Sequence, residues 1–207
     1  GSENFNKERR YGWFPSISGG WVPTQYDWYR NLLPFNNFLK FRASWGRVGN
    51  DRLKDENGND IRFPYLTTLG NVSSTWGTGL AENRTGSMNL KWEVSTKTNF
   101  GIDARFFDDK VDMTVDFFHT KTTDIFQRRA NIPDEGGLSN VLPYANIGSM
   151  KSWGMDGTLA YTHTFNKDMA LTVRGNFTHA ENEVIYWEQS GVNYPYQSNS
   201  GVPYKVQ

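Results

Sequence analysis

Two neighbouring segments of the chain alternate between apolar and polar residues with a period of two, which is typical of half-buried β-strands. The apolar positions are Phe100, Ile102, Ala104 and Phe106 in residues 97–107, and Val111, Met113, Val115 and Phe117 in residues 111–121. An antiparallel hairpin with its tip at Asp108 and Asp109 places both apolar sets on one face. The same register sets Arg105 opposite Asp112 on the other face, so opposite charges meet there.

A second hairpin is predicted from residues 153–165 and 169–179, which flank a tip at residues 166–168. A three-residue tip pairs Phe165 with Met169 and Tyr161 with Val173 on one face. Two further strands are expected upstream, at 38–48 and, weakened by Pro15 and several glycines, at 11–21. The pattern therefore predicts an all-β fold, an antiparallel meander of about six long strands.

The connections fall into two classes. Short links at 22–37 (with room for one helical turn), 108–109 and 166–168 alternate with long polar loops at 49–96, 122–152 and 180–207. Strands of ten or more residues match the length that a tilted strand needs to cross a bilayer. Short turns at one end and long loops at the other are typical of bacterial outer-membrane barrels. Half-buried strands of a soluble β-sandwich show the same alternation, so periodicity alone leaves both architectures open.

Composition narrows the classes of function. The 207 residues hold 22 Lys+Arg against 22 Asp+Glu, so no basic excess supports nucleic-acid binding through bulk charge. The chain has no Cys, which excludes disulfides, thiol catalysis and Cys-ligated zinc. No apolar run is long enough for a transmembrane helix. The first ten residues are polar and the last are loop-like, so we expect a piece of a longer protein.

No motif with the residue types and spacing of an active site is present. The three histidines form no HExxH motif and no metal-ligand spacing, and the acidic pairs fall in predicted turns. Residues 55–60 suggest a calcium loop, but the sixth position is Asp60 instead of Gly. Leu66 stands where a bidentate Glu belongs. We therefore expect no enzymatic activity, no metal and no cofactor.

Aromatic residues on the predicted loops are the remaining candidates for ligand binding. Such rings stack on sugar faces or contact peptides, but they also pack loops together or mark a membrane interface. The candidates are Tyr65, Trp76, Trp187, Tyr194 and Tyr196.

The segments in their order and spacing resemble the SusC/RagA group of TonB-dependent outer-membrane transporters, known from Bacteroidetes. The resemblance covers most of residues 11–185. It is carried by YGWFPSISGGW (11–21), LKFRASWGRVGND (39–51), NLKWEVSTKTNFGIDARFF (89–107), VDMTVDFFHTKTTDIF (111–126), NIGSMKSWGMDGTL (146–159) and GNFTHAENEVI (175–185).

The resemblance implies that residues 1–207 are part of a 22-stranded transmembrane β-barrel in a Gram-negative outer membrane. The plug domain and its TonB-contacting segment are expected to be absent from this chain. Such transporters import an oligosaccharide or peptide with a SusD-like surface lipoprotein, driven by the TonB system through the plug. The long loops then face outside the cell, the short links face the periplasm and the apolar alternates face lipid. The residues expected to face the lumen or the plug are Lys40, Arg42, Asp103, Arg105, Asp112 and Arg174.

The alternative from a different class is a soluble secreted β-sandwich that binds carbohydrate through loop aromatics such as Trp76 and Trp187. It predicts a folded monomer without detergent. It also predicts that replacing those rings by Ala lowers the affinity for sugar.

Overall fold

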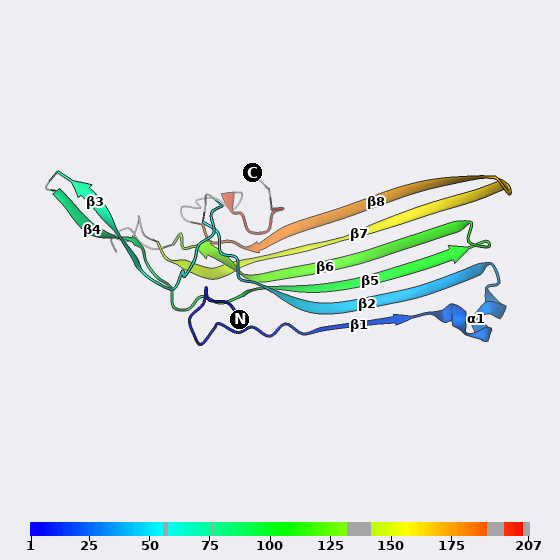
Figure 1. The fold of residues 1–207 in the computed structure, drawn as a ribbon, viewed down its shortest axis with the longest axis horizontal. Helices are drawn as coiled ribbons and strands as arrows, with labels where there is room; N and C mark the ends of the chain where they lie inside the picture. The colour runs from blue at the N-terminus through cyan, green and yellow to red at the C-terminus, as the bar shows by residue number, and fades with distance from the viewer. Residues whose placement is uncertain (56–57, 76, 132–141, 190–196, 205–207) are drawn as a thin grey trace.

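The computed structural model describes residues 1–55, 58–75, 77–131, 142–189 and 197–204. Six antiparallel strands form one long sheet in the order β1-β2-β5-β6-β7-β8 (Figure 1). A separate two-stranded hairpin, β3-β4, extends beyond one end of that sheet (Figure 1). The strands are β1 (Ser16–Trp21), β2 (Asn36–Asn50), β3 (Thr68–Ser74), β4 (Gly77–Arg84), β5 (Glu93–Phe106), β6 (Val111–Arg128), β7 (Tyr144–Asn166) and β8 (Met169–Tyr186).

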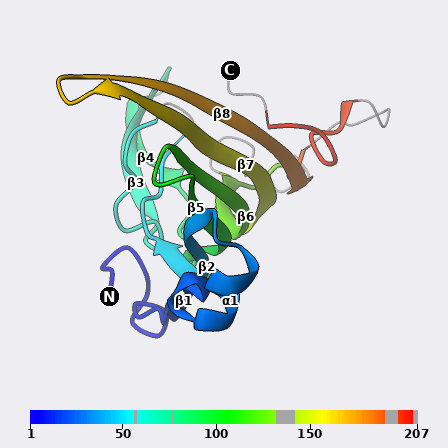
Figure 2. The ribbon, with the colours of Figure 1, turned by 90° about the vertical axis from the view of Figure 1, so that its right-hand side faces the viewer.

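The sheet is a curved meander in which each strand lies beside the next strand of the sheet order. Viewed along the strands, it follows an arc from β1 to β8 (Figure 2). Among the described residues, β1 and β8 each have a partner on one side alone, so both edges of the sheet are open. Unpaired strand edges are a site for pairing with further strands.

The predicted register of the β5–β6 hairpin is confirmed. Phe106 pairs with Val111 and Arg105 with Asp112, and the pairing continues unbroken along both strands. At the tip, Asp108 and Asp109 have φ angles of 55° and 61°. Asp tolerates this left-handed region better than most residues.

The β7–β8 register is confirmed along its length but not at its tip. Tyr161 pairs with Val173 as predicted, whereas Phe165 does not pair with Met169: Asn166 takes that position. The side-chain Oδ1 of Asn166 accepts a hydrogen bond from the backbone N–H of Asp168 at 3.0 Å. This local bond closes a tighter tip and leaves Phe165 as the extra residue of a bulge.

Most strands extend well beyond the predicted boundaries. β6 runs to Arg128 instead of residue 121, β7 begins at Tyr144 instead of 153, and β8 runs to Tyr186 instead of 179. The predicted loop at 49–96 also contains the β3–β4 hairpin. The alternation of apolar and polar residues fades in these extensions, but backbone pairing needs no apolar face and continues.

The N-terminal strand is shorter than predicted, because it begins at Ser16, directly after Pro15, which lacks a backbone donor. The link at 22–37 contains a short 3₁₀ helix, η1 (Pro23–Gln25), and one short helix, α1 (Asp27–Leu32), as expected for a helical turn. Among the described residues, no helix has the length and apolar character that crossing a membrane requires.

The buried core lies at the loop end of the sheet. Phe5, Leu53, Ile61 and Leu90 form a cluster there that Trp92 also contacts. The apolar face of the six-stranded sheet, by contrast, is open. The exposed fractions of its residues include 44% for Phe117, 52% for Leu159 and 59% for Val173. An exposed apolar surface this extensive marks a membrane or protein interface.

Candidate functional site

All six residues predicted to face a lumen lie on one face of the sheet. Side chains alternate along a strand, and residues paired across strands share a face. Lys40 on β2 pairs with Asp103 on β5, and Arg105, two residues further along β5, pairs with Asp112 on β6. Asp112 also pairs with Ala160 on β7, and Ala160 pairs with Arg174 on β8. Arg42 belongs to the same face, two residues from Lys40. We call this the polar face, and the opposite one the apolar face.

An arginine on β2 connects three strands of the polar face. Arg42 donates from Nε to Oδ2 of Asp103 at 2.8 Å and from Nη2 to Oδ1 of the same residue at 3.0 Å. Its Nη2 also donates to Oδ2 of Asp116, on β6, at 3.0 Å. The forked guanidinium is suited to such a two-carboxylate arrangement because its donors lie in one plane.

Gly101 lies between these partners and makes the contact possible. It pairs with Arg42 on one side and with Asp116 on the other. A Cβ at position 101 would lie 2.7 Å from Nη2 and 2.8 Å from Cζ of Arg42, and it would also meet the carboxylate of Asp116. The absence of a side chain therefore leaves the space that the guanidinium occupies.

A hollow of about 420 Å³ lies on the polar face over this cluster. It is lined by charged and polar groups, together with glycines, which have no side chains to fill the space. The polar lining residues are Ser18, Lys40, Arg42, Ser44, Asn99 and Asp116. Such a lining suits a polar ligand or another polar protein surface.

Arg105 makes a different ion pair from the one that its register suggests. It lies opposite Asp112, but its guanidinium contacts Asp109 of the hairpin tip at 3.5 Å. The guanidinium also lies over the ring of Phe38, 4.7 Å from the centroid. Stacking on Phe38 competes with the cross-strand partner for the direction of the side chain. Within the described chain, Lys40, Asp112 and Arg174 have no ion-pair partner at all.

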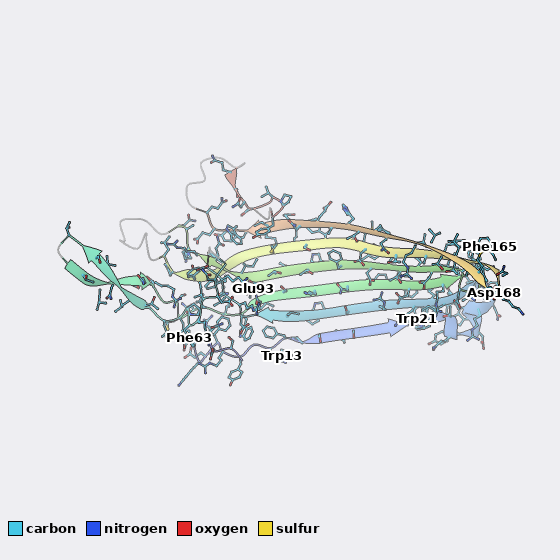
Figure 3. All side chains as sticks on the ribbon, turned by 45° about the horizontal axis from the view of Figure 1, so that its top comes forward. Trp13, Trp21, Phe63, Glu93, Phe165 and Asp168 are labelled. Carbon is cyan, nitrogen blue, oxygen red and sulfur yellow. The ribbon has the colours of Figure 1, made fainter. Side chains whose placement is uncertain are left out.

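The apolar face has aromatic residues toward both ends, and phenylalanines such as Phe41, Phe100 and Phe117 lie among aliphatic residues between them. Trp45 and Trp153 lie in one row across the strands near the loop end, with His119 between them. Phe106 and Tyr161 lie in one row near the short-turn end, with Val111 between them, and Figure 3 labels Phe165 at the same end. Aromatic belts on either side of an apolar band are typical of transmembrane barrels.

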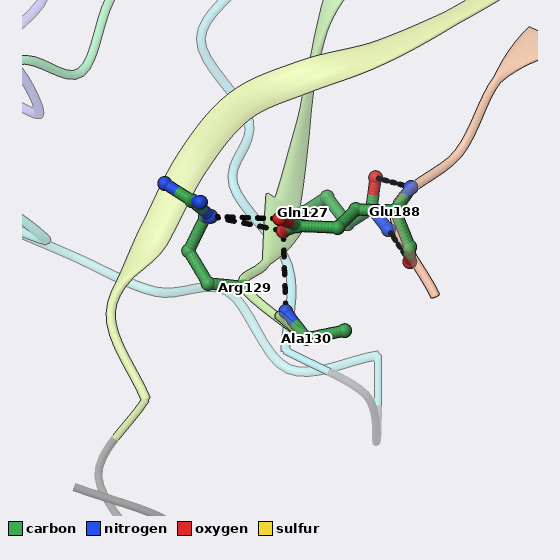
Figure 4. A network of polar contacts seen from close by, with 4 residues as sticks. All are labelled: Gln127, Arg129, Ala130 and Glu188. Carbon is green, nitrogen blue, oxygen red and sulfur yellow. Dashed lines mark hydrogen bonds and ion pairs between the residues drawn. The ribbon is translucent and has the colours of Figure 1, made fainter. Parts of the chain in front are cut away.

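A buried carboxylate ties the end of β8 to the end of β6 (Figure 4). The side chain of Glu188 is only 5% exposed. Its Oε2 accepts hydrogen bonds from Nε of Arg129 at 2.9 Å and from the backbone N–H of Ala130 at 3.1 Å. Gln127 donates from Nε2 to the backbone oxygen of Glu188 at 2.7 Å. These bonds fix the start of the segment that follows β8.

The predicted loop aromatics are placed only in part. Tyr65 packs edge-on against Phe63 with centroids 6.4 Å apart, and Trp187 lies 6.4 Å from Tyr204. Both rings are half-buried against their own segments, which agrees with the loop-packing interpretation. Trp76, Tyr194 and Tyr196 lie outside the described residues. In the part of the chain that the structure describes, no cluster of His, Asp or Glu could hold a metal ion.

Several residues of these networks were not among those predicted from the sequence. Asp116 is one of the polar residues that alternate with apolar residues in 111–121, so this alternation could have assigned it to the polar face. Gly101 shares that register, but only the position of Arg42 reveals its role. Glu188 lies in a predicted loop and gave no signal.

A family model described as "TonB dependent receptor-like, beta-barrel" matches residues 1–204. Among curated relatives, TonB-dependent receptor P39 of Formosa agariphila is 34% identical over 185 residues, covering 89% of this chain and 17% of the relative. TonB-dependent receptor SusC of Bacteroides thetaiotaomicron is 28% identical over 189 residues, covering 89% of this chain and 18% of that protein.

A solved structure of the RagAB peptide importer in its closed-closed state has a TM-score of 0.72 and 25% identity, covering 91% of this chain and 20% of that one. The open-open state of the same importer has a TM-score of 0.71 and 26% identity, covering 89% of this chain and 19% of that one. The chain therefore spans about a fifth of the length of the relatives that it matches.

Proposed function

The chain belongs to the TonB-dependent receptor-like β-barrel family, as a SusC/RagA-type segment of an outer-membrane barrel, and we propose that its parent protein imports a nutrient. The observation that carries the proposal is the contrast between the two faces of one curved sheet. One face exposes a band of apolar residues with aromatic rows near its ends, and the other carries a network of charges beside a polar hollow. A barrel wall that separates lipid from a polar lumen requires this contrast.

In this proposal the apolar face contacts lipid and the polar face lines the lumen or contacts a plug domain. The open edges of β1 and β8 pair with neighbouring strands of the parent barrel, because an unpaired strand edge in lipid costs several kcal/mol per polar group. The loop end, with β3–β4, faces outside the cell, and the short turns face the periplasm.

We further propose a SusD-like surface lipoprotein as partner and TonB-driven gating through a plug. The cargo is an oligosaccharide or a peptide, polar enough to pass a hollow lined by Lys40, Asn99 and Asp116. The RagAB structures are those of a peptide importer, and that likeness favours peptides as the first class to test.

The soluble β-sandwich is the weaker candidate. A sandwich needs a second sheet over the apolar face. Among the described residues the only other sheet is the β3–β4 hairpin, which lies beyond the end of the six strands (Figure 1).

The facing of the sheet can be tested by labelling single cysteines, because this chain has none of its own. Ile102→Cys and Asp103→Cys are neighbours on opposite faces of β5. Each is placed in the full-length receptor after other cysteines have been removed, and outer membranes are treated with lipid-soluble or water-soluble maleimides. Preferential labelling of position 102 by the lipid-soluble reagent and of 103 by the water-soluble one supports the proposal. Equal labelling of position 102 by both reagents contradicts it.

The import function can be tested in a strain that lacks the receptor, grown on panels of oligosaccharides and oligopeptides as sole nutrient. Loss of growth on one class, restored by the intact gene, supports import and identifies the cargo. Unchanged growth on both classes contradicts the proposed cargo.

A further inference from the structure

Three basic residues form a row on the apolar face, just beyond the aromatic row at the loop end. We propose that this row, Arg47, Lys121 and Lys151, binds the phosphorylated headgroup of a lipid in the outer leaflet. The inference rests on the proposed membrane orientation of the sheet. It assigns a ligand to the face opposite the one that carries the polar hollow.

The strand register aligns these cations. Arg47 pairs with Thr96, Thr96 with Lys121, and Lys121 with Lys151, so the residues form one line across four strands. Each cation is two residues beyond the aromatic row, Arg47 beyond Trp45 and Lys151 beyond Trp153. Two residues of strand advance by roughly 7 Å. Aromatic belts lie at the headgroup level, so the cations stand where lipid phosphates are found.

The charges of the row are not balanced by the protein. Lys121 lies directly opposite Lys151, and like charges in that position repel each other. Glu183 neutralises Lys151, with Nζ and Oε2 2.9 Å apart, and that ammonium also lies 5.2 Å from the ring centroid of Trp153. Arg47 and Lys121 are exposed and have no ion-pair partner among the described residues. An external anion would relieve this excess of two positive charges.

A second hollow, of about 340 Å³, adjoins the row at Arg47. Tyr11 and Trp13 line it, and these residues are 81% and 84% exposed. Figure 3 shows Trp13 beside the loop end of β1. Lys91 also lines this hollow but is paired with Asp124 at 2.9 Å. Arg9 and Glu8 line the hollow as well, and Arg9 donates from Nη1 to the backbone oxygen of Asn89 at 3.1 Å. Arg47 therefore lies beside two exposed rings without an ion-pair partner among the described residues, an arrangement that suits an amphipathic ligand.

A lipid is favoured over free phosphate because the row continues directly into the apolar band. A lipid whose phosphate lies at Lys121 can lay its acyl chains along the face that contains Phe117 and Leu159. Inorganic phosphate gains only the exposed ionic contacts, which are weak and screened by salt.

The test measures lipid binding to the purified full-length receptor in a neutral detergent by native mass spectrometry. The probe is bisphosphorylated lipid A, and the matched probe is the same lipid without its phosphates. Near a membrane surface each basic residue strengthens binding by about fivefold. The double variant Arg47→Gln/Lys121→Gln should therefore bind bisphosphorylated lipid A roughly 25-fold more weakly.

The control variant is Lys97→Gln. Lys97 is equally exposed and lies only one residue along the ladder from the row, but on the opposite face. The affinity of the Lys97→Gln receptor for bisphosphorylated lipid A should stay within twofold of that of the unmodified receptor. An equal loss in the control, or no loss in the double variant, overturns the assignment.

Two measurements on the unmodified receptor do not depend on how well the variants fold. Removing the phosphates from the lipid should weaken binding, and millimolar inorganic phosphate should fail to displace the lipid. Equal binding of both lipids, or complete displacement by inorganic phosphate, overturns the proposal. The maleimide test of face orientation is independent, so failure of lipid binding with correct labelling rejects this inference alone.

Discussion

The guanidinium of Arg42 on β2 reaches across an intervening strand to the carboxylate of Asp116 on β6, with Nη2 and Oδ2 3.0 Å apart. It crosses directly above Gly101, where no side chain obstructs it. One residue therefore links three strands on the polar face and forms one side of the hollow.

Replacing Gly101 by alanine should break this link. The added Cβ would overlap the guanidinium, so Arg42 must leave Asp116, and the three strands lose a shared contact. The groups are partly exposed, so we expect a loss of only about 1 kcal/mol in unfolding free energy. Urea unfolding of the full-length receptor in lipid measures this change in unfolding free energy. Gly19→Ala is the control, since nothing lies within 4 Å of a Cβ there; equal effects of both variants would refute the role of Gly101.

An arginine in the middle of the apolar band should be costly. Ile102 lies there between Phe41 and Val115, and Ile102→Arg should lower the unfolding free energy of the receptor in lipid by ~2–4 kcal/mol. Thr114→Arg, on the polar face of the neighbouring strand, should change it far less. A penalty near zero at Ile102 would show that this face does not contact lipid.

Removing the charge of Glu188 should loosen the end of β8. Glu188→Gln keeps the size of the side chain but weakens the bonds from Arg129 and Ala130. A buried, charge-assisted network of this kind contributes about 1–3 kcal/mol. Hydrogen exchange of the backbone amides of residues 127–130 and 186–189 should be faster in this variant than in the unmodified receptor. The exposed Glu181→Gln, which loses only a contact with His179, should leave those rates unchanged; faster exchange in both variants would argue against a specific clamp.

An asparagine on β7 should hold the segment that precedes β5. Asn146 accepts from the N–H of Lys91 at 2.9 Å and donates to the backbone oxygens of Lys91 and Asp124, both at 2.7 Å. Asn146→Ala removes all three bonds and should cost about 0.5–1.5 kcal/mol, because water can replace the partner in the two exposed bonds but not fully in the part-buried bond to Asp124. Thermal unfolding of the full-length receptor in lipid measures the loss of stability. Asn176→Ala, which loses one exposed contact with Thr158, is the control and should be near neutral.

The residue pattern alone was sufficient to predict the faces and registers of the central strands. Placing the apolar residues of β5 and β6 on one face requires the residue numbers of each cross-strand pair to sum to an odd value. A tip at Asp108 and Asp109 then selects one alignment, and that alignment is observed. Each apolar residue must face away from polar surroundings, and a shift of one residue would reverse every side chain. The six polar-face residues followed from the same rule.

The ends of the strands and the pairing of the charges, by contrast, depend on the folded arrangement of the chain. Beyond the aromatic rows the alternation fades, yet backbone pairing carries β7 back to Tyr144, because ladder hydrogen bonds do not depend on side-chain type. Arg105 had Asp112 opposite but pairs with Asp109, and Arg42 reaches Asp116 over a glycine. Such partners depend on side-chain directions and on free space, and for Arg42 and Asp116 they also depend on strands that are not consecutive in the chain. A period-two pattern contains no information about either.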